Sequence, residues 1–498
     1  MTKNKPSKLV YIGAGSFRFS IPCFMNILEA EILHPLELWL VDIDLRSLKL
    51  TSTIMKYMTK FHKKNINVHS TTNRRKALPD ADYVLISISV GLQESEWFDI
   101  HIPLKFGIPQ NTGDTVGPGG IFRGIRTIPI MVNIMRDIKE LCPNCLVLNF
   151  TNPQGTTMLS AFQAAPNVQS IGLCHELFRL GRKKFAKYLH YCDVDFSAEK
   201  KVELLYGGVN HFAFVTKFEN DGIDLYPQIR DNANYAYQSK RFGIPFNYYL
   251  LKKYGFLTYV EGRHIVEFLP RYYNYFNHRE KPFGITELRN VHHVYLERTL
   301  TYTFFKILQK RRNRWILKLI LRPWEGGEKA LMIPKDKERN IPRHHVGNVI
   351  NNGIIPSLPS NSVIEVPCYF KNGKYHPVKI GSLPKPINDW VKIYAKNQQL
   401  VVNAALSGEY DDLLKALLAD PMCQFIEDND KIESMMMHMH YYEKRWLPNF
   451  NDSVLLINDL KKSKYFIDKK ELSSYKLARM EKFAPDPKLK DKAWPIVP

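Results

Sequence analysis

The sequence predicts an α/β protein that begins with a Rossmann-type parallel sheet and continues into a mixed α+β region. Apolar strand-like runs alternate with helical stretches over the first 200 residues, and a glycine-rich turn follows the first run. Such alternation is typical of a parallel sheet with crossover helices. The pattern changes after residue 200, so we predict a dinucleotide-binding domain over residues 1–200 and a mixed domain over residues 201–498.

The expected strands of the first domain are short and almost wholly apolar, as strands covered on both faces require. After the first of them, apolar residues recur at helical spacing from about residue 20 to residue 32. The expected strands cover residues 8–12, 36–41, 83–88, 145–150 and 170–173.

The second domain has a different pattern. Residues 202–206 and 212–218 predict strands of a separate, antiparallel sheet. Helices are expected over residues 386–407 and 411–418, after a proline-rich connection at residues 354–360. We expect this domain to carry much of the substrate pocket.

Composition limits the class of protein. The chain has 498 residues, 45% of them hydrophobic, which suffices for one or two packed domains. No run of eighteen apolar residues predicts a membrane span, and the polar N-terminus lacks a secretory apolar segment, so a cytoplasmic location is expected. Seven scattered cysteines do not form a disulfide framework, and we interpret Cys142 and Cys145 as two partly buried thiols.

The net charge of +21 would suit nucleic acid, an anionic membrane or an acidic small substrate, and does not choose among them. Residues 306–322 are basic and apolar at helical spacing, so a membrane-binding or nucleic-acid-binding protein without catalysis is an alternative. A core helix with a solvated basic face or a subunit contact is the favoured interpretation. We therefore expect neither nucleic acid nor membrane as a partner, and assign no role to the tail from residue 461.

A cofactor site is predicted at the first strand-to-helix turn. Gly13 and Gly15 let the backbone approach a pyrophosphate, and Ser16 opens the helix whose N-terminus favours the anion. Arg18 stands where the usual fingerprint has its third glycine. Asp42 ends the second strand, where a carboxylate holds ribose hydroxyls and repels a 2′-phosphate, which favours NAD over NADP.

Polar residues also follow several of the other strands. Asn149 and Asn152 flank the end of one, Cys174 and His175 end another, and residues 207–211 close with a histidine. Open α/β sheets bind ligands at such strand ends, and a thiolate with an imidazole can hold a divalent metal. From spacing alone, a lone buried cysteine and a hydrogen-bonded histidine are the default interpretation.

A series of motifs resembles the family 4 glycoside hydrolases, the NAD-dependent exception among glycosidases. The likeness extends over about residues 8–425, and residues 114–127 are its most specific stretch. The motifs occupy residues 13–16, 41–44, 114–127, 149–153, 172–175, 208–211, 262–270, 363–367 and 404–408.

The resemblance implies a fold like that of lactate and malate dehydrogenases, with NAD and a divalent metal, usually Mn²⁺. Position by position, it implies that Cys174 and His211 hold the metal and that His175 protonates the leaving group. Asp114 and Asn152 would bind sugar hydroxyls. The second domain would then carry substrate, metal and oligomer contacts, with a homodimer or homotetramer expected.

The implied mechanism oxidises C3 of the sugar with NAD⁺, removes the C2 proton and eliminates the aglycone from C1. Water then adds at C1 and the hydride returns to C3. The C2 base is expected to be Tyr259 or Glu261, and Arg263 is expected close to the substrate. Residues 343–347 depart from the family pattern at the expected pocket edge.

The substrate implied by the resemblance is an unphosphorylated α-glycoside. The sequence Cys174-His-Glu176 resembles that branch, and residues 263–268 resemble the α-galacturonidases. A basic pocket suits a uronic acid, because arginine binds carboxylates in bidentate geometry. An NAD-dependent hydroxy-acid dehydrogenase of the same fold is the alternative enzyme.

Overall fold

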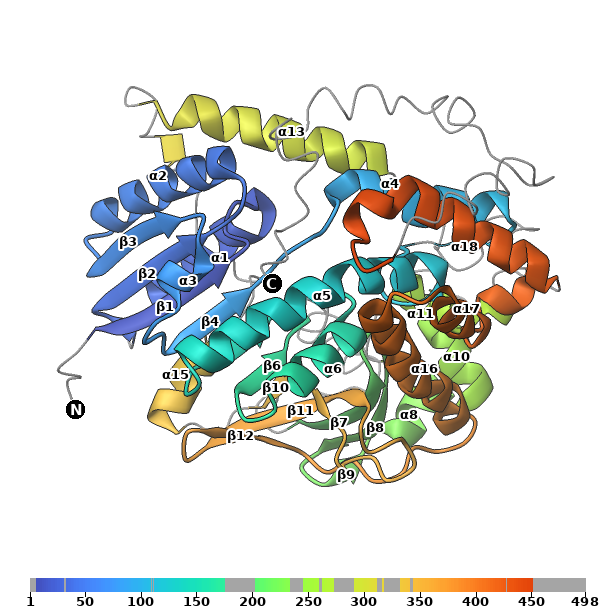
Figure 1. Cartoon of the computed structure of the whole chain (residues 1–498). Coiled ribbons are helices and arrows are strands. Elements are labelled where there is room, and N and C mark those ends of the chain that lie inside the picture. Colours follow the sequence, from blue (N-terminus) through green and yellow to red (C-terminus); the bar gives the residue numbers. More distant parts are fainter. Residues whose placement is uncertain are drawn as a thin grey trace.

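The structure is a computed structural model of the whole chain, shown in Figure 1. It describes residues 6–30, 33–108, 110, 112–174, 202–232, 245–258, 262–272, 291–310, 316–317, 332–340, 344–426 and 428–450. All structural statements below concern these residues.

The centre of the molecule is one twelve-stranded sheet with the order β3-β2-β1-β4-β5-β6-β10-β11-β7-β8-β9, and β12 pairs with β11. Its first six strands are parallel. The parallel strands are β1 (Ser7–Ile12), β2 (Leu36–Val41), β3 (Ile66–Thr71), β4 (Tyr83–Ile86), β5 (Leu146–Asn149) and β6 (Gln169–Gly172). The antiparallel strands are β7 (Val202–Val209), β8 (Phe212–Asn220), β9 (Ile223–Asp224), β10 (His345–Ile350), β11 (Val363–Lys371) and β12 (Lys374–Pro377).

The parallel half confirms the predicted α/β class, and its strands are buried on both faces. Leu9 and Tyr11 of β1 belong to one hydrophobic cluster, while Val10 and Ile12 belong to another on the opposite face. All four side chains are fully buried, which accounts for the unbroken apolar run in the sequence. The added strand β3 alternates buried and exposed positions, because it lies at the edge of the sheet.

The antiparallel half corrects one prediction. Strands β7 and β8 form the expected antiparallel pair, but they belong to the same sheet as the parallel strands. Strands β10 and β11 come more than 120 residues after β8 in the chain, yet they lie between β6 and β7 and make the sheet continuous. The parallel edge at β6 is thus satisfied by β10, which removes the need for a second sheet.

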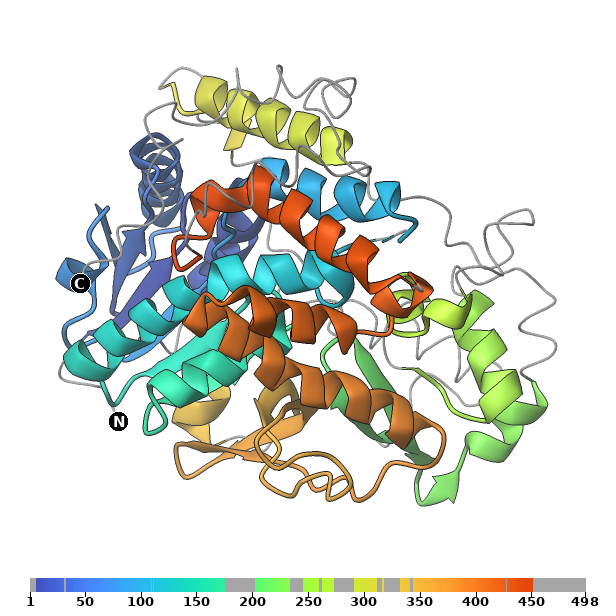
Figure 2. The same cartoon turned by 45° about the vertical axis from the view of Figure 1, so that its right-hand side comes forward.

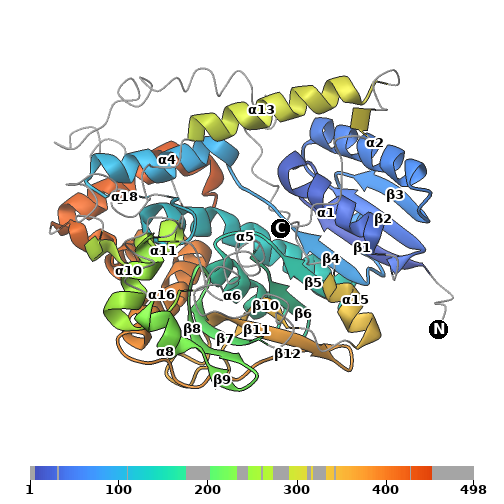
Figure 3. The same cartoon turned by 180° about the vertical axis from the view of Figure 1, so that it is seen from behind.

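Helices cover both faces of the sheet, and α5 runs through the middle of the molecule (Figures 1 and 2). Helix α5 packs against α4, α6 and α16, and α13 lies across α2 and α4 (Figure 3). No helix in the described ranges is long and apolar enough to cross a membrane. The longer helices are α1 (Phe17–Glu29), α2 (Leu45–Phe61), α4 (Leu92–Lys105), α5 (Gly117–Leu141), α6 (Gln154–Ala164), α10 (Pro245–Tyr254), α13 (Val291–Leu308), α15 (Met332–Arg339), α16 (Ile387–Ser407), α17 (Tyr410–Leu418) and α18 (Asn429–Glu443). The shorter ones are α3 (Arg74–Ala77), α8 (Tyr226–Asp231) and α11 (Gly262–Phe268).

Candidate active site

The glycine turn after β1 has the close packing that a nucleotide-binding turn requires. Gly13 has φ +93°, and a Cβ there would lie 1.9 Å from the carbonyl oxygen of Ser87 on the neighbouring strand end. The N–H groups of Gly13 and Ala14 donate to the carbonyl of Val41 at 2.8 and 3.0 Å. The turn is therefore fixed to both adjacent strands, and only glycine fits at position 13.

Asp42 lies against the same turn. Its carboxylate accepts the N–H of Gly15 at 2.7 Å and that of Asp44 at 2.9 Å. Burial raises the pKa of Asp42 to about 6, and these two N–H donors limit the rise. Ser16 precedes α1 without a side-chain capping bond, so its hydroxyl does not satisfy the first N–H groups of the helix. The predicted cofactor residues thus lie together at the carboxyl ends of β1 and β2.

A thiol and an imidazole from distant parts of the chain meet at the other predicted site. The Sγ of Cys174 lies 3.1 Å from Nε2 of His211, and both side chains are buried. Cys174 follows β6, and His211 lies in the two-residue turn between β7 and β8 with φ +64°. A positive φ is unusual for a histidine, and the turn uses it to aim the ring back at the sheet edge.

The hydroxyl of Thr115 determines which nitrogen of His211 carries the proton. Thr115 Oγ1 donates to Asp114 Oδ1 at 2.6 Å and lies 2.8 Å from His211 Nδ1. A hydroxyl whose hydrogen is given to a carboxylate must accept from its other neighbour, so Nδ1 of His211 is the protonated nitrogen. The lone pair of Nε2 is therefore directed at the thiol of Cys174.

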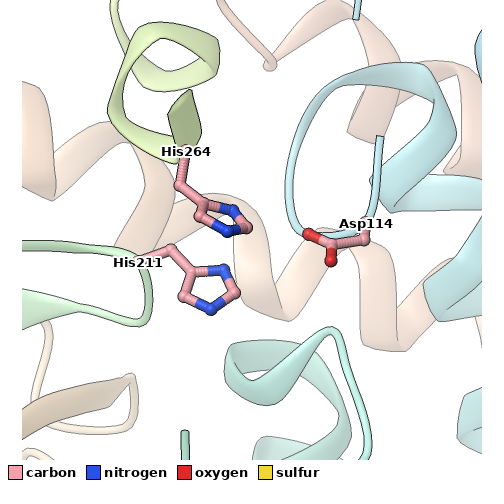
Figure 4. A group of neighbouring side chains, drawn as sticks. All are labelled: Asp114, His211 and His264. Atoms are coloured by element: carbon pink, nitrogen blue, oxygen red, sulfur yellow. The ribbon is translucent and has the colours of Figure 1, made fainter. Parts of the chain in front are cut away.

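A second histidine, His264 of α11, completes a group of three metal-ligand side chains. Figure 4 shows the two imidazoles and the carboxylate of Asp114 facing a common centre. One ligand atom from each lies within 4.8 Å of the others, and the rings of His211 and His264 are 4.2 Å apart at their centroids. His264 Nδ1 is buried without a hydrogen-bond partner, and is thus available to a ligand.

Asp114 stays ionised in this buried place. Burial by itself would raise the pKa of Asp114, but the neighbouring His264, His211 and Arg123 lower it well below its usual range. The site therefore holds one carboxylate charge beside two imidazoles and a thiol. Such a set of donors suits a divalent cation or several sugar hydroxyls.

The loop that carries Asp114 is held by two carboxylates of the second half of the chain. Glu267, one helical turn after His264, accepts the N–H groups of Thr112 and Gly113 at 2.5 and 3.0 Å. Asp420 accepts the N–H of Gly117, the first residue of α5, at 2.9 Å. Both ends of the loop are thus fixed, because main-chain donors and buried acceptors satisfy each other.

The other predicted site residues lie partly outside this picture. His175, Tyr259 and Glu261 lie outside the described residues, so their predicted roles stay predictions. Arg263 is the second residue of α11, directly before His264, and its side chain is likewise not described. Asn152 follows β5 and is partly buried at the same edge of the sheet.

Sequence reasoning missed His264, Thr115, Glu267 and Glu365. The histidine and Glu267 stand three residues apart within the stretch 262–270, a spacing that places both on one helix face. Glu365 is a single acidic residue inside the apolar strand β11. Both signals were present in the sequence, since a carboxylate in a buried run needs specific hydrogen-bond donors.

Comparison with known families finds two matches that together cover most of the chain. The family described as "Family 4 glycosyl hydrolase" matches residues 8–190, and "Family 4 glycosyl hydrolase C-terminal domain" matches residues 206–423. Both matches describe a glycoside hydrolase, so the chain is an enzyme of that class. The chain belongs to the family 4 glycosyl hydrolases.

Individual relatives align with this chain over nearly their whole length. An alpha-galactosidase of Bacillus subtilis is 30% identical over 89% of this chain and 99% of its own. An alpha-galacturonidase of Thermoanaerobacter italicus is 27% identical over 88% and 98%. A 6-phospho-alpha-glucosidase from gut microorganisms, solved with NAD and Mn²⁺, shares the fold with a TM-score of 0.73 at 19% identity, over 90% of this chain and 100% of its own.

Proposed function

We propose that the protein hydrolyses an unphosphorylated α-glycoside, with an α-galacturonide as the preferred substrate, using NAD and a divalent metal. The observation that carries the proposal is the meeting of Cys174, His211, Asp114 and His264 at one buried place. These residues come from four separate parts of the chain. A solely structural role would not require a thiol, two imidazoles and an ionised carboxylate together.

The donor set fits a metal such as Mn²⁺. The pair Cys174 Sγ and His211 Nε2 would hold it, because both atoms face each other and the protonated Nδ1 is held elsewhere by Thr115. The partner on Nδ1 orients the ring and strengthens the other nitrogen as a ligand. Two protein ligands leave the remaining positions for the hydroxyls of the sugar.

The glycine turn fits NAD. The N–H groups at the start of α1 and the hydroxyl of Ser16 would hold the pyrophosphate, and the carboxylate of Asp42 would accept the ribose hydroxyls. A 2′-phosphate would lie against Asp42 and be repelled. We therefore infer NAD, not NADP, as the cofactor.

When bound, NAD supplies reversible hydride acceptance at C3 of the sugar, and the metal supplies Lewis-acid stabilisation of the charge that develops between C2 and C3. The side chains of the protein would position the sugar and transfer protons to and from it. Asp114 is held ionised and would accept a sugar hydroxyl, as Asn152 would at the end of β5. His175 would protonate the leaving oxygen, and Tyr259 or Glu261 would remove the C2 proton.

The substrate class rests on chemistry and on relatives. The relatives named alpha-galactosidase and alpha-galacturonidase act on α-linked, unphosphorylated sugars by their names. A uronate adds a carboxylate, and Arg263, beside His264 on α11, would bind it. The chain also carries a net charge of +21, which would draw an acidic glycoside toward the protein.

Family membership sets aside the hydroxy-acid dehydrogenase and the non-enzymatic binding protein as primary functions. Residues 311–315 and 318–322 of the basic segment lie outside the described residues. We propose a cytoplasmic location, where NAD is supplied, and a homodimer or homotetramer as the working assembly.

The test is hydrolysis of p-nitrophenyl α-galacturonide, α-galactoside and α-glucoside with NAD⁺, Mn²⁺ and a thiol reductant, each also with NAD⁺ or metal omitted. The reaction is run in D₂O and the released sugar is analysed by NMR. We expect the galacturonide to react fastest and deuterium to appear at C2. A better rate with galactoside would move the proposal to neutral sugars, and hydrolysis without C2 exchange would refute the redox mechanism.

A further inference from the structure

Four residues form a row across the sheet between the two proposed metal ligands. Gly172 of β6 pairs with Asn348 of β10, Asn348 pairs with Glu365 of β11, and Glu365 pairs with Gly208 of β7. We call Gly172, Asn348, Glu365 and Gly208 the crossing row. Cys174 follows one end of it by two residues, and His211 follows the other end by three.

At the crossing row, neighbouring strands of the sheet are joined by very few backbone residue pairs. Among the described residues, β6 and β10 share one residue pair, and β11 and β7 share one residue pair. Strand β10 pairs with β11 over six residues, so the hairpin itself is well fixed. A single pair specifies register weakly, and a slip by one residue would turn Asn348 and Glu365 to the other face.

Side-chain hydrogen bonds help to fix the register that the single backbone pairs specify only weakly. Glu365 Oε2 accepts Nδ2 of Asn210 at 2.7 Å and Nδ2 of Asn348 at 3.2 Å, and the backbone N–H of His211 also donates to this carboxylate. The Asn348 amide lies 3.4 Å from the carbonyl of Gly172. Hydrogen bonds therefore extend from the strand before Cys174 to the turn that contains His211.

These contacts are fully enclosed. Glu365 and Asn348 are 0% exposed and Asn210 is 2% exposed. Burying a carboxylate costs free energy unless N–H donors surround it. The hydrogen bonds to Glu365 offset that cost inside β11. The glycines are equally constrained: a Cβ at Gly172 would lie 2.9 Å from Cβ of Asn348, and one at Gly208 would lie 2.2 Å from the carbonyl of Phe212.

We propose that Glu365, through Asn348 and Asn210, is the positioning residue that sets the separation between Cys174 Sγ and His211 Nε2. This inference rests on the proposed function, in which those two atoms hold the metal. Glu365 contacts the main chain of His211 and not its ring, so it acts by placing the turn. Partners of this kind typically change metal affinity by about 10- to 100-fold when removed.

The test is a titration of the metal-free protein with Co²⁺, followed through the near-ultraviolet thiolate-to-cobalt absorption. We expect Glu365→Ala to weaken Co²⁺ binding by about 10- to 100-fold. Glu365→Gln should bind within about threefold of wild type, because its amide oxygen accepts the same donors. Its amide N–H groups can also meet Oδ1 of Asn210 and of Asn348, both of which are unpaired.

Asp336→Asn is the matched control. Asp336 is as buried as Glu365, and its carboxylate lies 2.8 Å from Nε2 of His345. His345 is on the same strand as Asn348 but is not part of the crossing row. Asp336→Asn should lower thermal stability and leave Co²⁺ affinity unchanged. Equal weakening by Asp336→Asn and Glu365→Ala would overturn the inference, since the effect would then be general.

Two further outcomes keep the inference apart from the proposed function. Should Glu365→Ala fail to fold, Asn348→Ala removes the link to β6 alone and should weaken Co²⁺ binding by about tenfold. Wild-type affinity in whichever of these variants folds would refute the positioning role. Absence of a thiolate band in the wild-type protein would instead refute Cys174 as a ligand, and with it the proposed metal site.

Discussion

The parallel and antiparallel halves of the sheet carry two sites that are built in opposite ways. The proposed cofactor site uses Gly13, Gly15, Ser16 and Asp42, which lie within thirty residues and directly follow two consecutive strands, β1 and β2. The thiol–imidazole site uses side chains from four places: the segment after β6, the β7–β8 turn, the loop before α5, and helix α11. A local site is fixed by the turns that carry it, whereas a dispersed site depends on strand register and buried contacts far along the chain.

The largest expected effect tests the dispersed site directly. Cys174→Ser keeps the size of the side chain but removes the thiolate, so we expect kcat/KM to fall by at least about a thousandfold. Cys142→Ser is the control, because Cys142 is also buried but follows the far end of α5, a helix roughly 37 Å long. Steady-state rates with NAD⁺ and Mn²⁺ make the comparison. Retained activity in Cys174→Ser would remove the thiol from the site.

A smaller effect concerns the support that the second half gives to the first. Burial raises the pKa of Asp420 from 3.8 to about 6, despite the N–H groups of Met422 and Gly117 that it accepts. A raised carboxyl pKa means that the folded state binds the proton more tightly, so its stabilisation is complete below pH 3.8 and is lost as the pH rises through 6. We expect the free energy of unfolding, wild type minus Asp420→Asn, to fall by about 2.4 kcal/mol between pH 4 and pH 7. Urea unfolding at several pH values measures it, and a constant difference would contradict the assignment.

The smallest effect should stay within the cofactor half. Asp42→Ala removes the proposed acceptor of the ribose hydroxyls, which is worth about 1.5–3 kcal/mol for a charged acceptor, or about 10- to 100-fold in the Kd of NAD⁺. Preference against NADP⁺ should decline at the same time. Glu37→Gln, on the same strand but paired with His69, should change neither. Weaker Co²⁺ binding in Asp42→Ala would show that the cofactor site and the thiol–imidazole site are not independent of each other.

Much of the parallel half could be predicted because its strands are self-contained apolar runs ending in glycine or polar residues. Strand β3 was missed, since Ile66–Thr71 alternates as an edge strand does and has only two buried side chains. The strands β10 and β11 could not be placed by pattern. His345–Ile350 contains histidine, glycine and asparagine, and nothing local indicates that it pairs with β6.

The candidate site was predictable in its residue types and not in its geometry. Cys174 and His211 were expected from the family resemblance, and the structure brings them to 3.1 Å, but the metal role itself stays a prediction. His264 was missed because its spacing from Glu267 places both residues on one helix face without indicating what that face contacts. Its meaning comes from Asp114, 150 residues earlier in the chain, and such pairings depend on tertiary packing.

The crossing row has a consequence for how such an enzyme can change over time. The separation of Cys174 and His211 is set by strand residues inside the sheet, whereas sugar pockets are shaped by the loops and helices around its edge. Loops can therefore be exchanged, lengthened or recharged while the proposed metal centre stays intact. New substrate ranges become reachable by small steps, with the chemistry inherited unchanged.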